Sequence, residues 1–270
     1  MRTEHLNETI TGLKRQGRVI TNIFPGCVED GAELTGVESD RSVVCWAAER
    51  FRMRAFYATI DVDDLIGLMG EIPKGVVTEQ LYRKEGENPQ KDIAERAGFE
   101  KLATYIRIST TFKSNPYDIP EVGRRAILNE YYDPAFGEYA GPEDIEELFQ
   151  LQKTIFDEKK EDVFTKEEWE DIIKNNNCML YREDGEIVTY YVYRREGVKL
   201  YGNISYNRGP ANYLYNIERR VFTKMWEDGV RESYAWYDMK NTKALIRRND
   251  AAREAVTHQS FLYNDIWEKQ

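Results

Sequence analysis

Cysteine and histidine are scarce in this sequence. It has 3 cysteines and 2 histidines in 270 residues, and Cys27, Cys45 and Cys178 lie far apart, without a CxxC pair. Disulfide frameworks and zinc sites both depend on cysteine or histidine at short, regular spacings. The scarcity argues against a disulfide-stabilised secreted domain and against a zinc protein, and we expect no metal.

Long apolar runs are also missing. No stretch approaches the ~18 residues that cross a membrane. The opening residues, MRTEHLNETITGLKRQ, are too polar for a signal peptide. We therefore expect a cytoplasmic protein with no membrane partner.

Positive charge is in deficit. There are 38 Lys and Arg residues against 48 Asp and Glu residues, which gives a net charge of −10. A general nucleic-acid binder needs a basic surplus to neutralise phosphates, so no nucleic-acid partner is expected. Two interpretations of the acidity stay open: a solvated surface, or attraction of a small-molecule or peptide amine.

Hydrophobic periodicity in the second half predicts an α/β fold with a mixed (α+β) sheet. A capping box, Thr165 with Glu168, marks the start of one helix, and Asp184-Gly185 marks a hairpin. The expected helices are 142–159, 165–176, one before Gly229 and one before the last strand; the expected strands are 178–182, 186–195, 198–206, 232–239 and 260–268.

The stretch from Val198 to Asn241 organises this half. A strand rich in β-branched and aromatic residues runs into Asn207-Arg208-Gly209-Pro210, which breaks it, because Gly supplies torsions that other residues avoid and Pro suits a first helical turn. A helix with an apolar stripe follows, and a second strand comes after it. The stripe consists of Leu214, Ile217, Val221, Met225 and Trp226.

A strand that turns through glycine into a helix N-terminus can hold an anion. The first amides of the helix have no partner within it, and the helix dipole is positive there. A diphosphate is the expected occupant, and Arg208 could add a charge-assisted bond. The alternative is an ordinary βαβ turn with nothing bound.

The loop resembles the acyl-CoA pyrophosphate loop of the GNAT N-acyltransferase superfamily, Gln/Arg-x-x-Gly-x-Gly/Ala with a Leu one turn later. Gly209, Ala211 and Leu214 match, whereas Tyr206 replaces the leading Gln/Arg. The order of elements over residues 130–270 is similar to the GNAT fold, and Asn241-Thr242-Lys243-Ala244 resembles its Asn-x-x-Ala/Ser. Arg247-Arg248 stand where relatives have Leu-Tyr, so the family's usual general acid is missing.

The resemblance implies an acyl-CoA-dependent N-acyltransferase, with acetyl-CoA or another acyl-CoA as co-substrate and no covalent enzyme intermediate. Tyr206 and Tyr237 are candidate acids, and Asp238 is the candidate base with Glu232 as an alternative. Tyr191, Tyr193, Tyr201 and Tyr237 either line an acceptor pocket or belong to the core. The implied acyl-CoA residues are Ile204, Ser205, Tyr206, Asn207, Arg208, Gly209, Pro210, Ala211, Asn212 and Asn241.

The first half is expected to be a degenerate GNAT-like repeat. Its helix 89–98, ending in Gly98-Phe99, is similar to the closing part of a GNAT domain, but Asp61-Val62-Asp63-Asp64 stands in the phosphate-loop position and repels a diphosphate. The expected domains are 1–120 and 121–270, two tandem GNAT-like domains, each a mostly antiparallel twisted sheet flanked by helices. The other expected helices are 4–16 and 63–72, the strands are 18–24, 42–48, 53–60, 76–83, 99–110 and 125–132, and residues 28–40 are expected to form a loop.

Two other functions stay open. The replaced Gln/Arg and the missing Tyr also fit a catalytically inactive GNAT-like module that binds a ligand or another protein. Some two-repeat relatives use aminoacyl-tRNA, although the acidic balance argues against that donor here. The sequence identifies neither the acceptor nor the oligomeric state.

Overall fold

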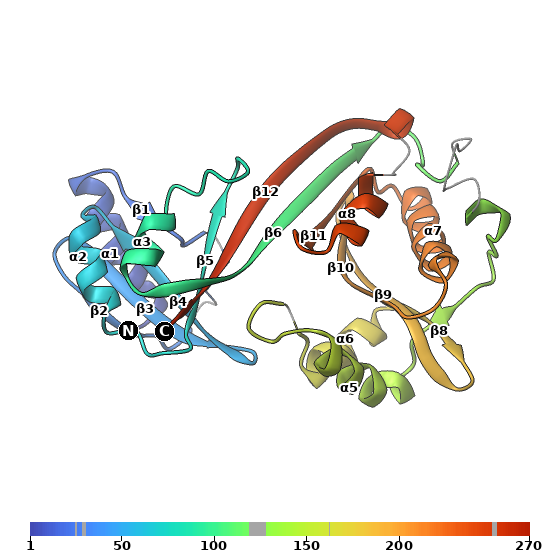
Figure 1. Cartoon of the computed structure of the whole chain (residues 1–270), viewed down its shortest axis with the longest axis horizontal. Helices are drawn as coiled ribbons and strands as arrows, with labels where there is room; N and C mark the ends of the chain where they lie inside the picture. Colours follow the sequence, from blue (N-terminus) through green and yellow to red (C-terminus); the bar gives the residue numbers. More distant parts are fainter. Residues whose placement is uncertain (25, 29–30, 119–127, 162, 250–252) are drawn as a thin grey trace. The chain divides into compact units, whose positions relative to one another are not determined.

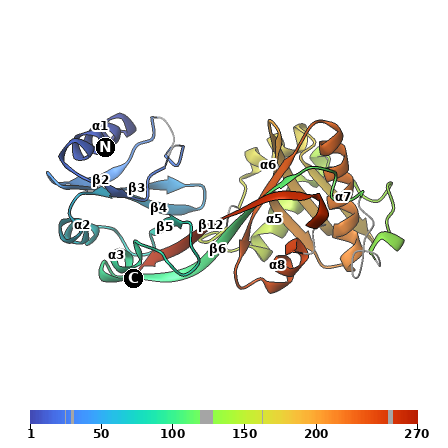
Figure 2. The ribbon, with the colours of Figure 1, turned by 90° about the horizontal axis from the view of Figure 1, so that it is seen from above.

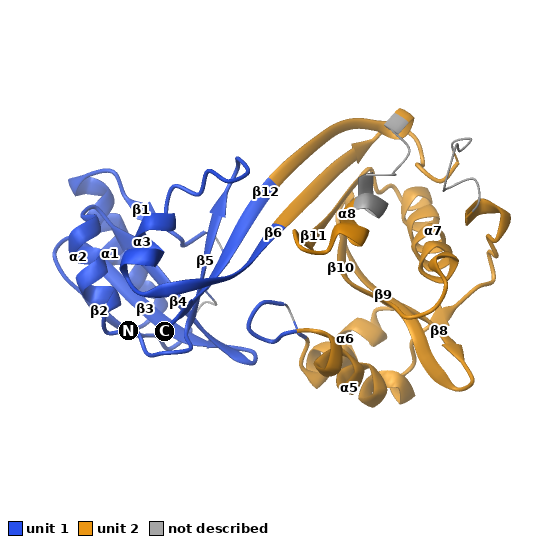
Figure 3. Cartoon of the chain, viewed as in Figure 1, with its two compact units in different colours: residues 1–105, 157–163, 262–270 blue, residues 106–156, 164–261 orange. Residues whose placement is uncertain are grey.

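The computed structural model describes residues 1–24, 26–28, 31–118, 128–161, 163–249 and 253–270. The chain forms two compact units (Figure 3). Unit 1 contains residues 1–105, 157–163 and 262–270, and unit 2 contains residues 106–156 and 164–261. Each unit therefore includes segments that are far apart in the sequence.

Unit 1 has helices on both faces of its sheet. Helix α1 covers one face, and α2 and α3 cover the other (Figure 2). Leu6, Ile10 and Leu13 recur at helical spacing on α1 and are buried against the sheet. The elements are α1 (Thr3–Gln16), β1 (Ile20–Thr21), β2 (Thr35–Glu38), β3 (Ser42–Glu49), β4 (Arg52–Thr59), α2 (Val62–Met69), β5 (Val77–Tyr82), α3 (Lys91–Arg96) and the beginning of β6 (Phe99–Phe112).

The strands of unit 1 follow the order β2-β3-β4-β5-β12-β6, with β1 paired to β4. Strands β2, β3 and β4 form an antiparallel meander, and α2 then crosses over to β5, which is parallel to β4. The C-terminal part of β12 (Val256–Lys269) pairs antiparallel with β5. Trp267 of this strand is 2% exposed, so the end of the chain supplies part of the core of unit 1.

Unit 2 repeats the order of meander, crossover helix and parallel strand (Figure 1). Its sheet follows the order β7-β8-β9-β10-β11-β6, with β12 beside β6. Helices α5 and α6 pack on one face and α7 on the other. The elements are β7 (Glu138–Tyr139), η1 (Pro142–Asp144), α5 (Ile145–Ile155), α6 (Lys166–Lys174), β8 (Cys178–Glu183), β9 (Glu186–Glu196), β10 (Lys199–Asn207), α7 (Ala211–Glu227), β11 (Glu232–Asp238), α8 (Thr242–Asn249) and η2 (Arg253–Ala255).

The expected α/β class, a mixed sheet flanked by helices, is confirmed, and several local expectations are corrected. The expected loop over 28–40 contains strand β2, and the strand expected over 18–24 is limited to β1. The helix expected to reach residue 159 ends at Ile155, whose side chain is 38% exposed. Of the strand expected over 125–132, residues 128–130 are helical and 125–127 lie outside the described residues.

The capping box and the hairpin are confirmed. The Thr165 hydroxyl accepts the Glu168 N–H at 3.2 Å, and the Glu168 carboxylate accepts the Thr165 N–H at 2.8 Å. Asp184 and Gly185 both have positive φ, 52° and 84°, as a two-residue hairpin turn requires. In the part of the chain that the structure describes, no helix is long and apolar enough to span a membrane.

Candidate functional site

Strands β10 and β11 separate partway along their length. Their parallel ladder covers only Lys199–Gly202 opposite Glu232–Ala235. Beyond it, β10 continues to Asn207 and β11 to Asp238. We call this diverging part, Asn203–Asn207 with Trp236–Asp238, the slot. Here β10 keeps its antiparallel ladder with β9, and within the described residues its pairing with β11 does not continue past Gly202, so a ligand could approach this edge.

A bulge in β10 determines which backbone groups point away from β9. The register with β9 shifts between Gly202 and Ile204, and beyond the shift the Arg208 N–H donates to the Val188 carbonyl at 3.0 Å. In an antiparallel ladder alternate residues face opposite neighbours, so the backbone groups of Ser205 and Asn207 point away from β9. They therefore point toward the side from which β11 has diverged.

The loop after β10 is held by one side chain. Asn207 accepts the Gly209 N–H at 3.2 Å with Oδ1, and its Nδ2 donates to the carbonyls of Gly209 and Pro210, both at 3.1 Å. Gly209 is not among the residues with positive φ, so the expected role of unusual torsions is wrong. The glycine is needed for space, because a β-carbon there would lie 2.6 Å from Cδ2 of Tyr213.

The N-terminus of α7 has no side-chain cap. Pro210 occupies the N-cap position, and no side chain accepts from the first turn. Tyr213 N–H bonds back to the Pro210 carbonyl, whereas the N–H groups of Ala211 and Asn212 have no hydrogen-bond partner among the described residues. These two amides, at the positive end of a 17-residue helix, are the strongest feature for binding an anion.

Arg208, expected to meet a diphosphate, already has an anionic partner. Its guanidinium forms an ion pair with the Glu186 carboxylate, and that hydrogen bond raises the pKa of Arg208. Both side chains are exposed. Glu186 therefore already neutralises part of the charge that Arg208 could offer to a phosphate.

Two of the three candidate catalytic side chains share a face of the sheet. Tyr206 packs beside Tyr190 in the cluster under α5 and α6, with ring centroids 5.6 Å apart. Tyr201, on the same face, stacks on Tyr234 of β11, and period-two alternation then places Asp238 on this face as well. The same alternation places Tyr237 on the opposite face.

Asp238 ends β11 and also shapes the turn after it. Its Oδ1 accepts the Lys240 N–H at 2.8 Å, and its carbonyl accepts the Asn241 N–H at 2.8 Å. Glu232, the alternative base, forms an ion pair of 3.2 Å with Lys199, where the parallel ladder begins. The slot opens beyond the other end of that ladder, so Asp238 is the better placed carboxylate.

Asn241 caps the helix that follows. Its Oδ1 accepts the Ala244 N–H at 3.2 Å at the beginning of α8. The side chains of Arg247 and Arg248 lie outside the described part of that helix.

The four tyrosines considered for an acceptor pocket are not on one face. Tyr191 and Tyr193 stack on each other and pack toward α7, whereas Tyr201 stacks with Tyr234 on the other face. That second face also carries Tyr234, Trp236 and Arg107, which belong to no sequence motif. Strand pairing brings these residues together, and no short motif could reveal them.

The corresponding place in unit 1 is filled by the chain itself. Strands β4 and β5 pair in parallel over only two residue pairs, and β1 takes the edge of β4 beyond them. The Asn22 side chain accepts the Tyr57 N–H at 2.8 Å and donates to the Ala55 carbonyl at 3.1 Å and to the Glu79 carbonyl at 3.2 Å, bridging both strands.

The N-terminus of α2 is occupied as well. The Asp61 carboxylate accepts the N–H groups of Asp63 at 3.1 Å and of Asp64 at 3.3 Å, and bonds from Arg41 and these amides lower its pKa. The amides that would meet a phosphate therefore already bind a carboxylate.

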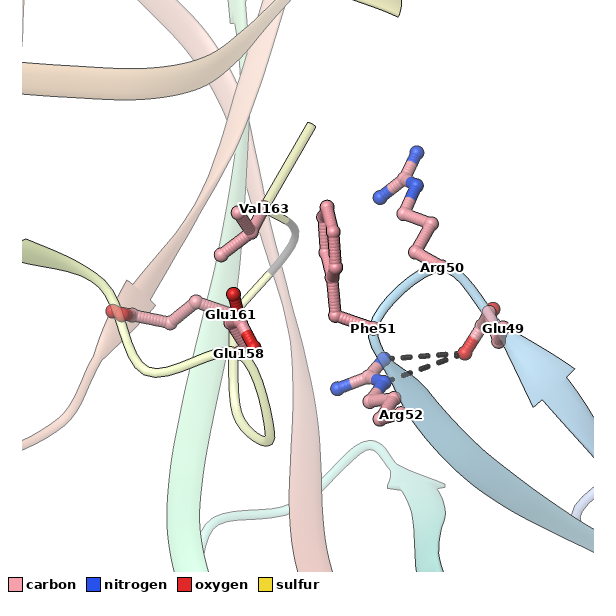
Figure 4. A pocket seen from close by; sticks show the side chains of 7 residues that line it. All are labelled: Glu49, Arg50, Phe51, Arg52, Glu158, Glu161 and Val163. Atoms are coloured by element: carbon pink, nitrogen blue, oxygen red, sulfur yellow. Dashed lines mark hydrogen bonds and ion pairs between the residues drawn. The ribbon is translucent and has the colours of Figure 1, made fainter. Parts of the chain in front are cut away.

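Unit 1 also contains a shallow pocket at the tip of the β3–β4 hairpin (Figure 4). Arg52 bonds to Glu49 beside it and donates to the Lys159 carbonyl at 3.0 Å, and burial raises the pKa of the lining residue Glu161. Among the described residues no group of three metal-ligating side chains occurs here or elsewhere. The bond from Arg52 to Lys159 holds the loop against the hairpin, and we assign the pocket no catalytic role.

Comparison with solved structures identifies the fold. A GCN5-related N-acetyltransferase from Sphaerobacter thermophilus matches with a TM-score of 0.54 and 15% identity, covering 88% of this chain and 82% of that one. A second such enzyme, from Kribbella flavida, gives 0.48 and 10% over 100% and 95% of the two chains. An acetyltransferase of the GNAT family from Colwellia psychrerythraea gives 0.44 and 10% over 87% and 84%. No protein-family model and no curated protein matches the sequence.

Proposed function

We propose that this chain, which has the fold of the GCN5-related N-acetyltransferases, transfers an acyl group from acyl-CoA to a primary amine. Acetyl-CoA is the expected donor, and a small molecule or peptide the expected acceptor. In our proposal unit 2 carries the site, residues 1–120 derive from a repeat that does not bind CoA, and the protein works in the cytoplasm.

One observation carries the proposal: the diverging strands and the uncapped helix lie next to each other in the chain. The β10 edge ends at Asn207, and the free amides of Ala211 and Asn212 follow within five residues. An extended amide-containing arm can pair with the edge while a diphosphate binds the helix amides. Unit 1 has the same βαβ order, but there Asn22 fills the place between the two strands and Asp61 accepts the first amides of the helix.

The reaction needs few groups from the protein. The amine nitrogen bonds to the thioester carbonyl carbon, the carbon–sulfur bond breaks, the amine loses a proton and the leaving thiolate gains one. Around Ile204–Tyr206, the backbone N–H groups of β10 that point away from β9 would bind the carbonyl oxygen as negative charge develops on it. Asp238 would take the proton from the amine, and Tyr206 or Tyr237 would protonate the thiolate.

A non-catalytic GNAT-like module is the second candidate. The Gly209 N–H already donates to Asn207, and Arg208 already forms an ion pair with Glu186. Two groups that could bind a phosphate therefore already have a partner. This alternative predicts that CoA binds but that no amine in a broad panel releases free thiol from acetyl-CoA.

A pair of substitutions at one exposed position tests the donor site. Ala211→Glu puts a carboxylate at the first residue of α7, where a negative charge favours the helix but repels a diphosphate. Repulsion of about 1–4 kcal/mol per charge pair would weaken acetyl-CoA binding at least tenfold. Calorimetric titration measures it, with Ala211→Gln as the uncharged control of the same size.

The control decides the interpretation. We expect Ala211→Gln to weaken binding less than Ala211→Glu, because it adds the same bulk without the charge. Equal binding by all three proteins, or none by the wild type, would show that the loop is not the donor site. Gly209→Asp is less clean, because its side chain would also clash with Tyr213.

A further inference from the structure

One half-buried arginine of unit 2 has no anionic partner. Arg107 lies on β6, next to β11 in the sheet. Within the described residues its guanidinium has neither a hydrogen bond nor an ion pair, and its Nε is buried and unsatisfied. Arg54 also has an unsatisfied Nε, but its guanidinium binds Glu49, whereas no part of the Arg107 guanidinium has an acceptor among the described residues, which is unusual for a half-buried charged group.

The other arginines in comparable surroundings all have acceptors. Every other described arginine whose side chain is buried or half-buried donates to a carboxylate, an amide oxygen or backbone carbonyls. These are Arg52, Arg54, Arg182, Arg219 and Arg220. In a chain with ten more acidic than basic residues, partners are abundant, so Arg107 is the exception.

Two aromatic rings hold Arg107 in place. Its Cζ lies 5.6 Å from the ring centroid of Tyr234 and 5.6 Å from that of Trp236. Cation–π contacts with the two rings occupy the faces of the guanidinium and leave the N–H groups in its own plane available to an acceptor. Tyr234 itself is fixed, because its hydroxyl donates to Glu196 at 2.5 Å.

The location connects this arginine with the slot. Trp236 is the first residue of β11 beyond the last parallel pair, Gly202 with Ala235. Asp238, the proposed base, follows Trp236 by two residues on the same face. A molecule that presents an amine to Asp238 can therefore extend a second group along β11 toward Arg107.

We propose that Arg107 binds a carboxylate of the acceptor, so that the acceptor is an amine that also carries a carboxylate, of the α-amino acid class. A carboxylate matches the fork of the guanidinium and can accept from its terminal N–H groups bidentately. Tyr234 and Trp236 supply the platform that orients the pair. This inference rests on the proposed function, since it identifies the acceptor of the same site.

Pairs of probes that differ only in the carboxylate test the inference. Each pair is an α-amino acid and its α-carboxamide, covering the standard side chains, titrated with and without CoA and followed by tryptophan fluorescence and calorimetry. We expect the wild type to bind at least one acid about tenfold or more tightly than its amide. Arg107→Gln should remove that preference, and Arg107→Lys should restore part of it.

Arg194→Gln is the matched control. Arg194 lies on the same face, 5.6 Å from the Tyr201 ring centroid, but Glu196 already binds it. Its removal should keep the preference for the acid. The inference is overturned if no acid binds the wild type more tightly than its amide, or if the preference survives in Arg107→Gln. The titrations without CoA measure binding at Arg107 directly, so a failure of acetyl-CoA to bind would contradict the proposed function without deciding whether Arg107 binds the carboxylate.

Discussion

The three thiols lie in surroundings that disfavour the thiolate. Cys45 and Cys178 are 0% and 1% exposed, and Cys27 is half-buried. Burial raises the pKa of each, and for Cys45, with a further contribution from Cys27, to about 12. A raised pKa leaves less thiolate at a given pH, and the thiolate is the reactive form.

We therefore expect slow reaction of the native protein with Ellman's reagent at pH 8. Cys27 should react first, and all three thiols should react promptly once urea unfolds the chain. Time courses of thionitrobenzoate release with and without urea check this. Rapid native reaction of two or more thiols, at the rate of free cysteine, would contradict the buried positions of Cys45 and Cys178.

At the scale of residues, the loop motif points to a site whose function stays a prediction, and it does not reveal the partners of its side chains. Gly209 and Ala211 were identified from the loop motif, but the hydrogen bonds of Asn207 depend on the loop conformation. Arg107 gave no signal in the sequence, because its importance comes from Tyr234 and Trp236, more than 120 residues away on a neighbouring strand. Asn22 likewise gives no signal in the sequence, because its partners Ala55, Tyr57 and Glu79 are distant along the chain.

Helix α6 shows how a short element is fixed at its start. The reciprocal bonds of Thr165 and Glu168 satisfy two N–H groups, and Trp169 and Ile173 on the next turns are buried at 0% and 6% exposure. A helix of nine residues is marginal without such a cap and a packed face.

Removing the cap should destabilise unit 2. We expect Thr165→Ala to lower the free energy of unfolding by about 1 kcal/mol, because the Glu168 N–H loses its acceptor. Thr165→Ser, which keeps the hydroxyl, should stay within about 0.5 kcal/mol of the wild type. Urea denaturation followed by circular dichroism measures both, and equal stability of the Ala and Ser variants would argue against the cap.

Among the elements, periodicity predicted best where one face is buried. The stripe of α7 is confirmed, with Leu214, Ile217 and Val221 at 3% exposure or less and Trp226 packed against the same cluster. Strand β2 was missed because Gly36 and Glu38 weaken its pattern and it pairs only along one edge, with β3. The bulge in β10 was missed because it depends on the register with β9.

For the whole molecule, β6 and β12 each contribute residues to both units. The expected division into 1–120 and 121–270 assigns the end of the chain to the second half, whereas the structure places residues 262–270 in unit 1. Such pairing between distant segments follows from tertiary contacts, which local patterns do not contain. Whether the two halves are repeats of one domain stays a prediction.

The two units should respond differently to the donor. Unit 2 has a diverging edge at Asn207 and free amides at Ala211 and Asn212, whereas Asn22 and Asp61 fill the corresponding positions of unit 1. Amides that gain hydrogen bonds from a ligand exchange more slowly with solvent, and this can be located along the chain.

Hydrogen–deuterium exchange of the intact protein, with and without saturating acetyl-CoA, tests most directly whether acyl-CoA binds at the N-terminus of α7. We predict slower exchange in peptides that cover residues 203–213 and no change in those that cover 58–65. The Ala211→Glu variant should lose the effect. Unchanged exchange over 203–213, or protection centred on 58–65, would contradict an acyl-CoA site at the head of α7.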